Sequence, residues 1–177
     1  GVEAEFVLDE GLSIIRGIVP MIDKPVASVG LSEKGYMSVT LTVEMEGGHS
    51  SYPEKETSVT VLNHALYKIN HRPMKARITG PVKDFFRYTG PEMPFLPRAV
   101  FANLWLFNGV VKKIYTATNT GNAVMRTISS PTMVTAGVKD NVIPTKAEAV
   151  VNFRKLPGEP SRDVIRHLQR IISDDRV

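Results

Sequence analysis

The sequence predicts an α+β fold, a split β-α-β sandwich in which helices cover one face of an antiparallel sheet. Apolar and polar residues alternate over residues 36–46, which indicates a strand with one buried face. Apolar residues recur at helical spacing after Thr57 and again after Ser161, which indicates two helices. Two strand-like stretches joined by a turn lie between them, over residues 132–155. This order is that of a ferredoxin-like sandwich without its last strand.

The chain opens with two candidate strands that precede the sandwich. Residues 5–9 read as a short buried strand that ends on Asp9, and residues 25–33 read as a second strand. The strand over 36–46 comes next and is the clearest of all, because its apolar residues occupy every second position. These apolar residues are Met37, Val39, Leu41, Val43 and Met45.

Glycines end this strand, and a capped helix follows. We expect Gly47 and Gly48 to need unusual backbone angles in the turn. Thr57 is placed to cap the helix, and Pro73 stops it. The apolar side chains of this helix fall at positions i, i+3, i+4 and i+7, which gives it one buried face.

Residues of about 80–128 interrupt the sandwich, and we expect a helical insertion there. Gly80 and Pro81 start a short helix, and a proline-rich connector follows it. Residues 98–115 then read as one long helix that is apolar on more than one face, and 119–122 read as a turn. Such a helix requires a partner, either a neighbouring domain or another subunit.

The last part of the chain returns to the sandwich. Residues 132–138 and 146–155 read as antiparallel strands joined by a turn at Asn141. Ser161 is placed to cap the final helix, whose apolar side chains form one stripe. One more strand would complete the sandwich, and we expect that strand to be missing.

Composition excludes several classes of protein. The chain has 177 residues with 42% hydrophobic and 23% charged content, which is typical of a globular domain. It has no cysteine, so disulfides and thiolate metal sites are excluded. Apolar runs are far shorter than a membrane span, and the start shows no signal-peptide pattern. The net charge of +4 is scattered rather than arranged in a basic stripe, so we expect no nucleic-acid partner.

Three polar residues stand where a binding or catalytic site is more plausible than a core. His49 lies in a tight glycine-rich turn, Asn141 lies at a second turn, and Arg154 lies near the end of a strand. Arginine presents a fixed fork of donors that matches a carboxylate. Because apolar residues flank Arg154, we expect it to be half-buried and costly without an anion.

Each of these residues has an ordinary structural alternative. His49 could bond only to the local backbone of its turn. Arg154 could form a salt bridge with Glu148 or Glu159. Asn141 could serve turn chemistry alone, and Asp9 could cap a turn at the end of its strand.

Six short motifs occur in order along the chain. They are Phe6-Val7-Leu8-Asp9-Glu10-Gly11, Gly47-Gly48-His49-Ser50-Ser51, Gly80-Pro81-Val82-Lys83, Pro91-Glu92-Met93-Pro94-Phe95, Phe101-Ala102-Asn103-Leu104-Trp105-Leu106-Phe107 and Gly137-Val138-Lys139-Asp140-Asn141-Val142-Ile143-Pro144. In this order and spacing they resemble the two-zinc aminoacylase and carboxypeptidase superfamily of metallopeptidases, and most of all its carboxypeptidase S and N-fatty-acyl-amino-acid hydrolase branch. The likeness covers essentially the whole chain, and the order and spacing of the motifs make it specific.

The resemblance implies a domain organisation and a partner. Residues 1–34 resemble the tail of the first half of a catalytic domain, and residues 35–177 resemble the lid inserted into that domain. Lids of this family pair, so a homodimer through the lid is implied. The resemblance also implies two zinc ions in the full-length enzyme. Most zinc ligands of the family have no match in this chain, so we expect this fragment alone to bind no zinc and to be inactive.

The resemblance also assigns roles to the four candidate residues. Asp9 matches a metal ligand. His49 matches the histidine that reaches the partner subunit's active site and stabilises the oxyanion of the tetrahedral intermediate. Asn141 and Arg154 match groups that bind the free carboxylate of the substrate.

Three functions remain to be compared. The first is the lid of a zinc-dependent metallopeptidase or amidohydrolase that cleaves amide bonds next to a free carboxylate, in peptides or N-acyl amino acids. The second is a free-standing dimerisation module without catalysis. The third is an RNA-binding sandwich, which is disfavoured because the best strand exposes Ser38, Thr40, Thr42 and Glu44 rather than stacking aromatics.

Overall fold

A computed structural model describes residues 3, 5, 14–17, 19 and 21–177 of the chain. Residues 6–9 of the strand expected over 5–9, including Asp9 at its end, lie outside the described residues. The chain divides into two compact units. One contains the described residues up to Glu33 together with 78–114, and the other contains residues 34–77 and 115–177.

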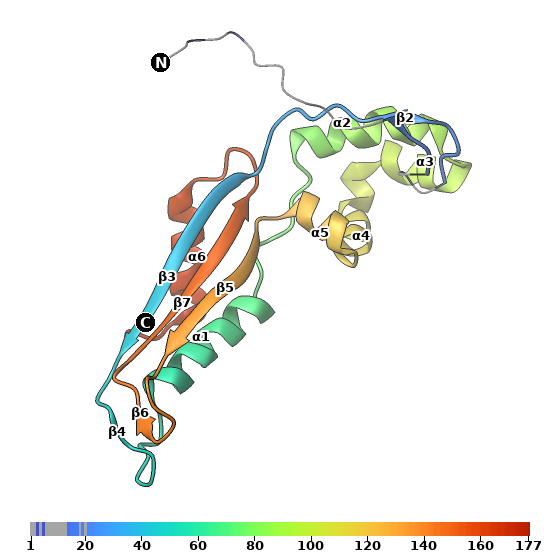
Figure 1. Ribbon diagram of the computed structural model, residues 1–177. Helices are drawn as coiled ribbons and strands as arrows, with labels where there is room; N and C mark the ends of the chain where they lie inside the picture. The colour runs from blue at the N-terminus through green and yellow to red at the C-terminus, as the bar shows by residue number, and fades with distance from the viewer. Residues whose placement is uncertain (1–2, 4, 6–13, 18, 20) are drawn as a thin grey trace. The chain divides into compact units, whose positions relative to one another are not determined.

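The larger unit is the predicted sandwich. Its sheet has the strand order β3-β7-β5, in which β3 (Gly35–Glu44) and β5 (Ile128–Ala136) both pair antiparallel with the central strand β7 (Lys146–Lys155). Helices α1 (Ser58–His71) and α6 (Ser161–Ile172) pack on one face of the sheet (Figure 1). The α+β class predicted from the sequence is confirmed.

The core of this unit forms where the alternating strand residues meet the helix stripes. Every second residue of β7 is buried, and the apolar positions of α1 and α6 close over them. The buried set is Leu41, Val43, Val61, Leu62, Ala65, Ile69, Ala147, Ala149, Val151, Phe153, Val164, Leu168, Ile171 and Ile172. The remaining strand residues are thereby left on the open face, which carries Ser38, Thr40 and Asn152.

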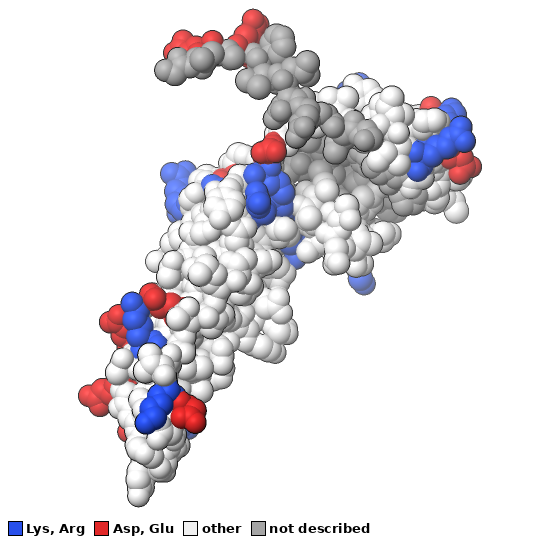
Figure 2. All heavy atoms as spheres, in the orientation of Figure 1, with Lys and Arg blue, Asp and Glu red and all other residues white. Residues whose placement is uncertain are grey.

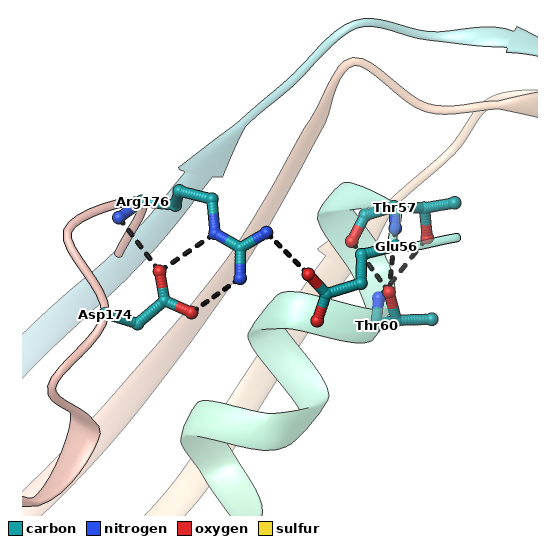
Figure 3. A network of polar contacts seen from close by, with 5 residues as sticks. All are labelled: Glu56, Thr57, Thr60, Asp174 and Arg176. Atoms are coloured by element: carbon teal, nitrogen blue, oxygen red, sulfur yellow. Dashed lines mark hydrogen bonds and ion pairs between the residues drawn. The ribbon is translucent and has the colours of Figure 1, made fainter. Parts of the chain in front are cut away.

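The N-terminal end of α1 is fixed by polar contacts. Thr57 is the N-cap, as predicted, and its hydroxyl oxygen accepts from the Thr60 amide while the Thr60 hydroxyl accepts from the Thr57 amide. Beside it, the Arg176 guanidinium bridges Asp174 and Glu56, each at 2.8 Å (Figure 3). The segment after α6 is thus tied to the start of α1. These bonds from Arg176 lower the pKa of Asp174 to about 2.

The smaller unit contains most of the predicted helical insertion. Its elements are β1 (Ile14–Ile15), β2 (Val26–Ala27), α2 (Gly80–Thr89), the short 3-10 helix η1 (Gly90–Glu92) and α3 (Phe95–Ala102). Helix α4 (Leu104–Thr116) begins in this unit and ends in the larger one. Phe86 stacks on Phe101 with ring centroids 4.5 Å apart, and Val19, Ile22 and Met93 form a second small cluster.

The long helix expected over 98–115 is wrong, because the structure breaks it at Asn103. The Asn103 side-chain amide donates to the Ala99 carbonyl, and the Asn103 carbonyl accepts from the Leu106 and Phe107 amides. One helix therefore ends and the next begins at the same residue. None of the described helices is both long and apolar enough to cross a membrane.

Four further boundaries differ from the sequence prediction, and the first is that of β5, which spans Ile128–Ala136 where a strand was expected over 132–138. The turn expected over 119–122 is part of helix α5 (Asn119–Met125), capped by the Thr118 hydroxyl. The strand expected over 25–33 is reduced to β2. Ser161 is the first residue of α6 rather than its cap, since Pro160 precedes the helix and the Ser161 hydroxyl accepts from Lys155.

Candidate functional site

His49 and Asn141 lie side by side at one tip of the larger unit. A two-stranded ribbon of β4 (Gly48–His49) and β6 (Val142–Ile143) extends beyond the end of the three-stranded sheet (Figure 1). His49 is paired with Val142, and the Ser50 amide donates to the Asn141 carbonyl at 3.2 Å. Two residues far apart in the sequence are therefore held together by backbone pairing.

Gly47 permits this close approach. A Cβ at that position would lie 2.7 Å from the Ile143 carbonyl oxygen and 2.8 Å from Thr145 Cγ2. At Gly48, a Cβ would meet no atom within 4 Å. The unusual backbone angles expected for both glycines are wrong, since neither has a positive φ. Gly47 is required by space rather than by conformation.

The ring of His49 is exposed and is oriented by Ser51. The Ser51 amide donates to Nδ1 at 3.2 Å, and the Ser51 hydroxyl lies 2.7 Å from the same atom. Because an amide can only donate, Nδ1 acts as an acceptor, and the neutral ring then carries its proton on Nε2. The local contact expected of an ordinary turn histidine is present, and it leaves a defined donor, Nε2–H, for another molecule.

The Asn141 side chain is not explained by turn chemistry alone. Its Oδ1 atom is buried without a hydrogen-bond partner among the described residues. Buried polar atoms are nearly always paired, and an asparagine that stabilises its own turn would bond this oxygen to a nearby amide. Turn chemistry therefore does not account for this oxygen, which has almost no accessible surface.

Arg154 is exposed, so the expectation of half-burial is wrong. The reason is the alternation along β7, in which Phe153 takes the buried position and Arg154 faces away from the helices. The two proposed salt bridges are not formed: Glu148 pairs with Lys146, and Glu159 pairs with Arg77. None of the ion pairs among the described residues includes Arg154. Its guanidinium carbon instead lies 5.1 Å from the centroid of the Tyr36 ring.

Arg154 and the tip lie at opposite ends of the same sheet. Arg154 is near the C-terminal end of β7, whereas the β4–β6 ribbon lies beyond its N-terminal end (Figure 1). The rise of a strand places Arg154 roughly 26 Å from Lys146, at the start of β7. The structure therefore brings His49 and Asn141 together and separates both from Arg154 within one chain.

Residues 31–176 match the family described as peptidase dimerisation domain. The chain belongs to this family. A probable carboxypeptidase S-like 2 of Dictyostelium discoideum is 40% identical over 98% of the chain. N-fatty-acyl-amino acid synthase/hydrolase PM20D1 is 39% identical in Xenopus tropicalis and 38% in Homo sapiens, each over 100% of the chain. The resemblance predicted from the motifs is confirmed.

This dimerisation domain spans about a third of the length of the curated relatives that it matches, 33% of the first and 35% of the second. A metallo-carboxypeptidase from Sulfolobus solfataricus has a structure that aligns over 80% of this chain and 40% of its own, at 16% identity and a TM-score of 0.46.

A metal centre is not formed by the part of the dimerisation domain that the structure describes. No group of three or more histidine, aspartate or glutamate residues with suitable positions is found there. Asp9, the predicted ligand, lies outside the described residues. Acidic and basic side chains are interspersed on the face drawn in Figure 2, and no continuous basic stripe crosses it.

The sequence did not reveal the polar cluster at the Arg154 end of the sheet. The Glu159 carboxylate, whose side chain is 7% exposed, accepts from Arg77 at 2.8 Å and from the Thr127 hydroxyl. Nearby, the Lys34 amine donates to the carbonyls of Ala123 and Arg126, and burial lowers its pKa while Glu159 opposes this shift. These contacts hold together the segments that enter and leave the larger unit. This polar cluster could be predicted only once the pairing of β5 with β7 was known.

Proposed function

We propose that this dimerisation domain belongs to a zinc-dependent hydrolase that cleaves amide bonds next to a free carboxylate. Peptides and N-acyl amino acids are the proposed substrates. The names of the relatives support the reaction class, since they are carboxypeptidase-like proteins and an N-fatty-acyl-amino acid synthase/hydrolase. The observation that carries the proposal is the tip, where backbone pairing holds an oriented histidine beside an asparagine.

His49 is proposed to stabilise the oxyanion of the reaction. Ser51 holds the ring so that the donor on Nε2 is directed outward, and such a donor gains strength as negative charge develops on the attacked carbonyl oxygen. Arg154 is proposed to bind the substrate carboxylate, with Asn141 contributing from the tip. The guanidinium of Arg154 is exposed and belongs to none of the ion pairs seen in the described part of the chain, which suits this role.

These roles require two chains in one site. The attacked carbonyl and the carboxylate lie within one amino acid of each other in the substrate, whereas His49 and Arg154 lie at opposite ends of a strand that spans roughly 26 Å. A symmetric homodimer with antiparallel sheets would place the tip of one chain beside the Arg154 end of the other. We therefore propose that each site takes Arg154 from one subunit and His49 and Asn141 from its partner.

The β5 edge is the proposed dimer contact. Among the strands of the described residues, this strand of nine residues pairs with β7 alone; it contains no charged residue and exposes Met133 and Val134. Long, uncharged, unpaired edges favour pairing with another strand, and most proteins protect them with charges. The pattern is consistent with an edge that another copy of the chain covers.

Residues 1–34 are proposed to be the tail of the first half of a catalytic domain, and residues 35–177 the lid, with an insertion at about 80–128. The start of the family match near residue 31 and the boundary between the two units at Glu33 support a division near residue 34, whereas residues 78–114 of the proposed lid belong to the same compact unit as the tail. The residues described here do not form a metal site. The proposed pair of zinc ions would therefore depend on ligands outside them, with Asp9 as one candidate.

The test is a kinetic comparison in the full-length protein. Hydrolysis of N-acyl amino acids and dipeptides is measured with added zinc and with a chelator. His49→Ala should lower kcat by about 100- to 1,000-fold with little change in KM. Arg154→Ala should mainly raise KM, because the carboxylate is charged throughout the reaction. A folded, dimeric protein that hydrolyses none of these substrates would favour the free-standing dimerisation module instead.

A further inference from the structure

Tyr36 lies directly beneath the guanidinium of Arg154. The two residues are cross-strand partners on β3 and β7, and the guanidinium carbon is 5.1 Å from the centroid of the tyrosine ring. A cation over an aromatic face is attracted by the ring and needs no hydrogen bond to stay there, so the N–H donors of the guanidinium remain for a carboxylate. The contact therefore restrains Arg154 without using its hydrogen-bonding capacity.

The tyrosine ring is itself held in place by two further residues. The Ser38 hydroxyl donates to the Tyr36 phenol oxygen at 3.3 Å, and the Asn152 side-chain amide donates to the Ser38 hydroxyl at 3.3 Å. Ser38 and Asn152 are the next cross-strand pair on the same face of the sheet. Asn152 and Ser38 thus hold the Tyr36 ring on the open face of the sheet, and the ring in turn contacts the Arg154 guanidinium.

Burial does not explain a tyrosine at this position. Tyr36 is 67% exposed and belongs to neither hydrophobic cluster, and its nearest same-face neighbour on β3 is the polar Ser38. A large exposed aromatic residue gains little from packing here. The interaction that its ring does make is the contact with the Arg154 guanidinium, for which the ring forms a platform.

We propose that Tyr36 is a positioning residue that holds the Arg154 guanidinium ready for the substrate carboxylate. The inference rests on the proposed function, in which Arg154 binds that carboxylate. An unsupported arginine would sample many rotamers, and binding would have to select one of them. The Tyr36 platform removes part of this cost before the substrate arrives, so it should affect substrate binding and leave the chemical step unchanged.

The experiment compares Tyr36→Leu and Tyr36→Phe in the full-length protein, with an N-acyl amino acid as the probe. Tyr36→Leu removes the aromatic face and should raise KM by about three- to tenfold with kcat within about twofold of the parent. Tyr36→Phe keeps the ring and loses only the weak contact with Ser38, so its KM should stay within about twofold of the parent. Tyr67→Leu is the matched control, because Tyr67 is 63% exposed and stacks on His71, away from Arg154.

A double-mutant cycle separates the inference from the proposal beneath it. With Arg154→Ala already present, Tyr36→Leu should change KM no further, because the two residues act as a unit. If Arg154→Ala raises KM but Tyr36→Leu does not, Arg154 binds substrate without help from Tyr36 and the inference fails alone. If Tyr36→Leu raises KM equally with and without Arg154, Tyr36 acts by another route and the inference also fails. If Arg154→Ala leaves KM unchanged, the proposed role of Arg154 is wrong, and the inference about Tyr36 fails with it.

Discussion

Replacing Gly47 by alanine should loosen the tip that carries His49 and Asn141. The new Cβ would lie 2.7 Å from the Ile143 carbonyl oxygen and 2.8 Å from Thr145 Cγ2. An ordinary contact would require these atoms to move by roughly 0.7 Å, and overpacking of this kind typically costs about 1–3 kcal/mol. The carbonyl belongs to β6, so it cannot move away without disturbing its pairing with β4.

Hydrogen exchange at the Ser50 amide reports this local strain. That amide donates to the Asn141 carbonyl at 3.2 Å, across the tip. A cost of 1–3 kcal/mol confined to the tip corresponds to about 5- to 150-fold faster exchange through local opening. Amides in the centre of β7 should exchange at an unchanged rate, because their pairing with β3 and β5 does not involve the tip.

Gly48→Ala is the matched control for this change. It makes the same substitution one residue away, where a Cβ would meet no atom within 4 Å. Neither glycine has a positive φ, so backbone strain does not distinguish the two variants. Equal exchange rates at Ser50 in Gly47→Ala and Gly48→Ala would refute the reasoning that space, rather than conformation, selects glycine at position 47.

Three further predictions concern stability and are measured by urea unfolding. Glu159→Ala should destabilise the protein by about 1–3 kcal/mol, because it leaves the donors of Arg77 and Thr127 without their nearly buried acceptor. Asp174→Asn should make the free energy of unfolding fall less steeply as the pH is lowered. Bonds from Arg176 lower the pKa of Asp174 from 3.8 to about 2. The stability that the Asp174 carboxylate contributes is therefore present above pH 3.8 and is lost as the pH falls through 2. That contribution should be small, because both side chains of the pair are partly exposed to solvent. Thr57→Ala should lower the free energy of unfolding by about 1 kcal/mol, because the helix cap is lost. Thr57→Ser keeps the capping hydroxyl and should retain most of that stability.

Regular alternation made the sheet predictable from the sequence. Residues 146–155 were expected as a strand and form β7 with these bounds, because a strand with one buried face leaves a period of two in the sequence. Helices were harder to delimit. The apolar sequence around Asn103 continues without interruption, and the break there depends on a side-chain bond to Ala99 that periodicity does not encode.

Gly121 shows that a glycine can be required for two different structural reasons. It suggested a turn, yet it lies in α5, where a Cβ would be 2.3 Å from the Tyr115 carbonyl oxygen. The glycine is therefore required by close packing against the preceding segment. Sequence alone does not distinguish this cause from a turn.

The candidate site was predicted residue by residue, but its arrangement was not. His49, Asn141 and Arg154 carry recognisable chemistry, whereas Tyr36 is visible as a partner of Arg154 only once the register of β3 against β7 is known. The separation of Arg154 from the tip likewise follows from the length and direction of β7. Spacing along a chain does not show which ends of a sheet two residues occupy.

The central claim is that one site takes Arg154 from one subunit and His49 from the other. The direct test mixes full-length His49→Ala and Arg154→Ala subunits that carry different tags, and isolates the hybrid dimers. In such a hybrid, one site would combine the intact Arg154 of the first chain with the intact His49 of the second. The other site would lack both residues.

The measured quantity is kcat/KM of the hybrid for an N-acyl amino acid or dipeptide. The account predicts that each parent dimer is strongly impaired, whereas the hybrid recovers about half of the wild-type activity, because one of its two sites is intact. Hybrids that form and remain as impaired as their parents would contradict the account. His49 and Arg154 would then either serve the same subunit or share no site.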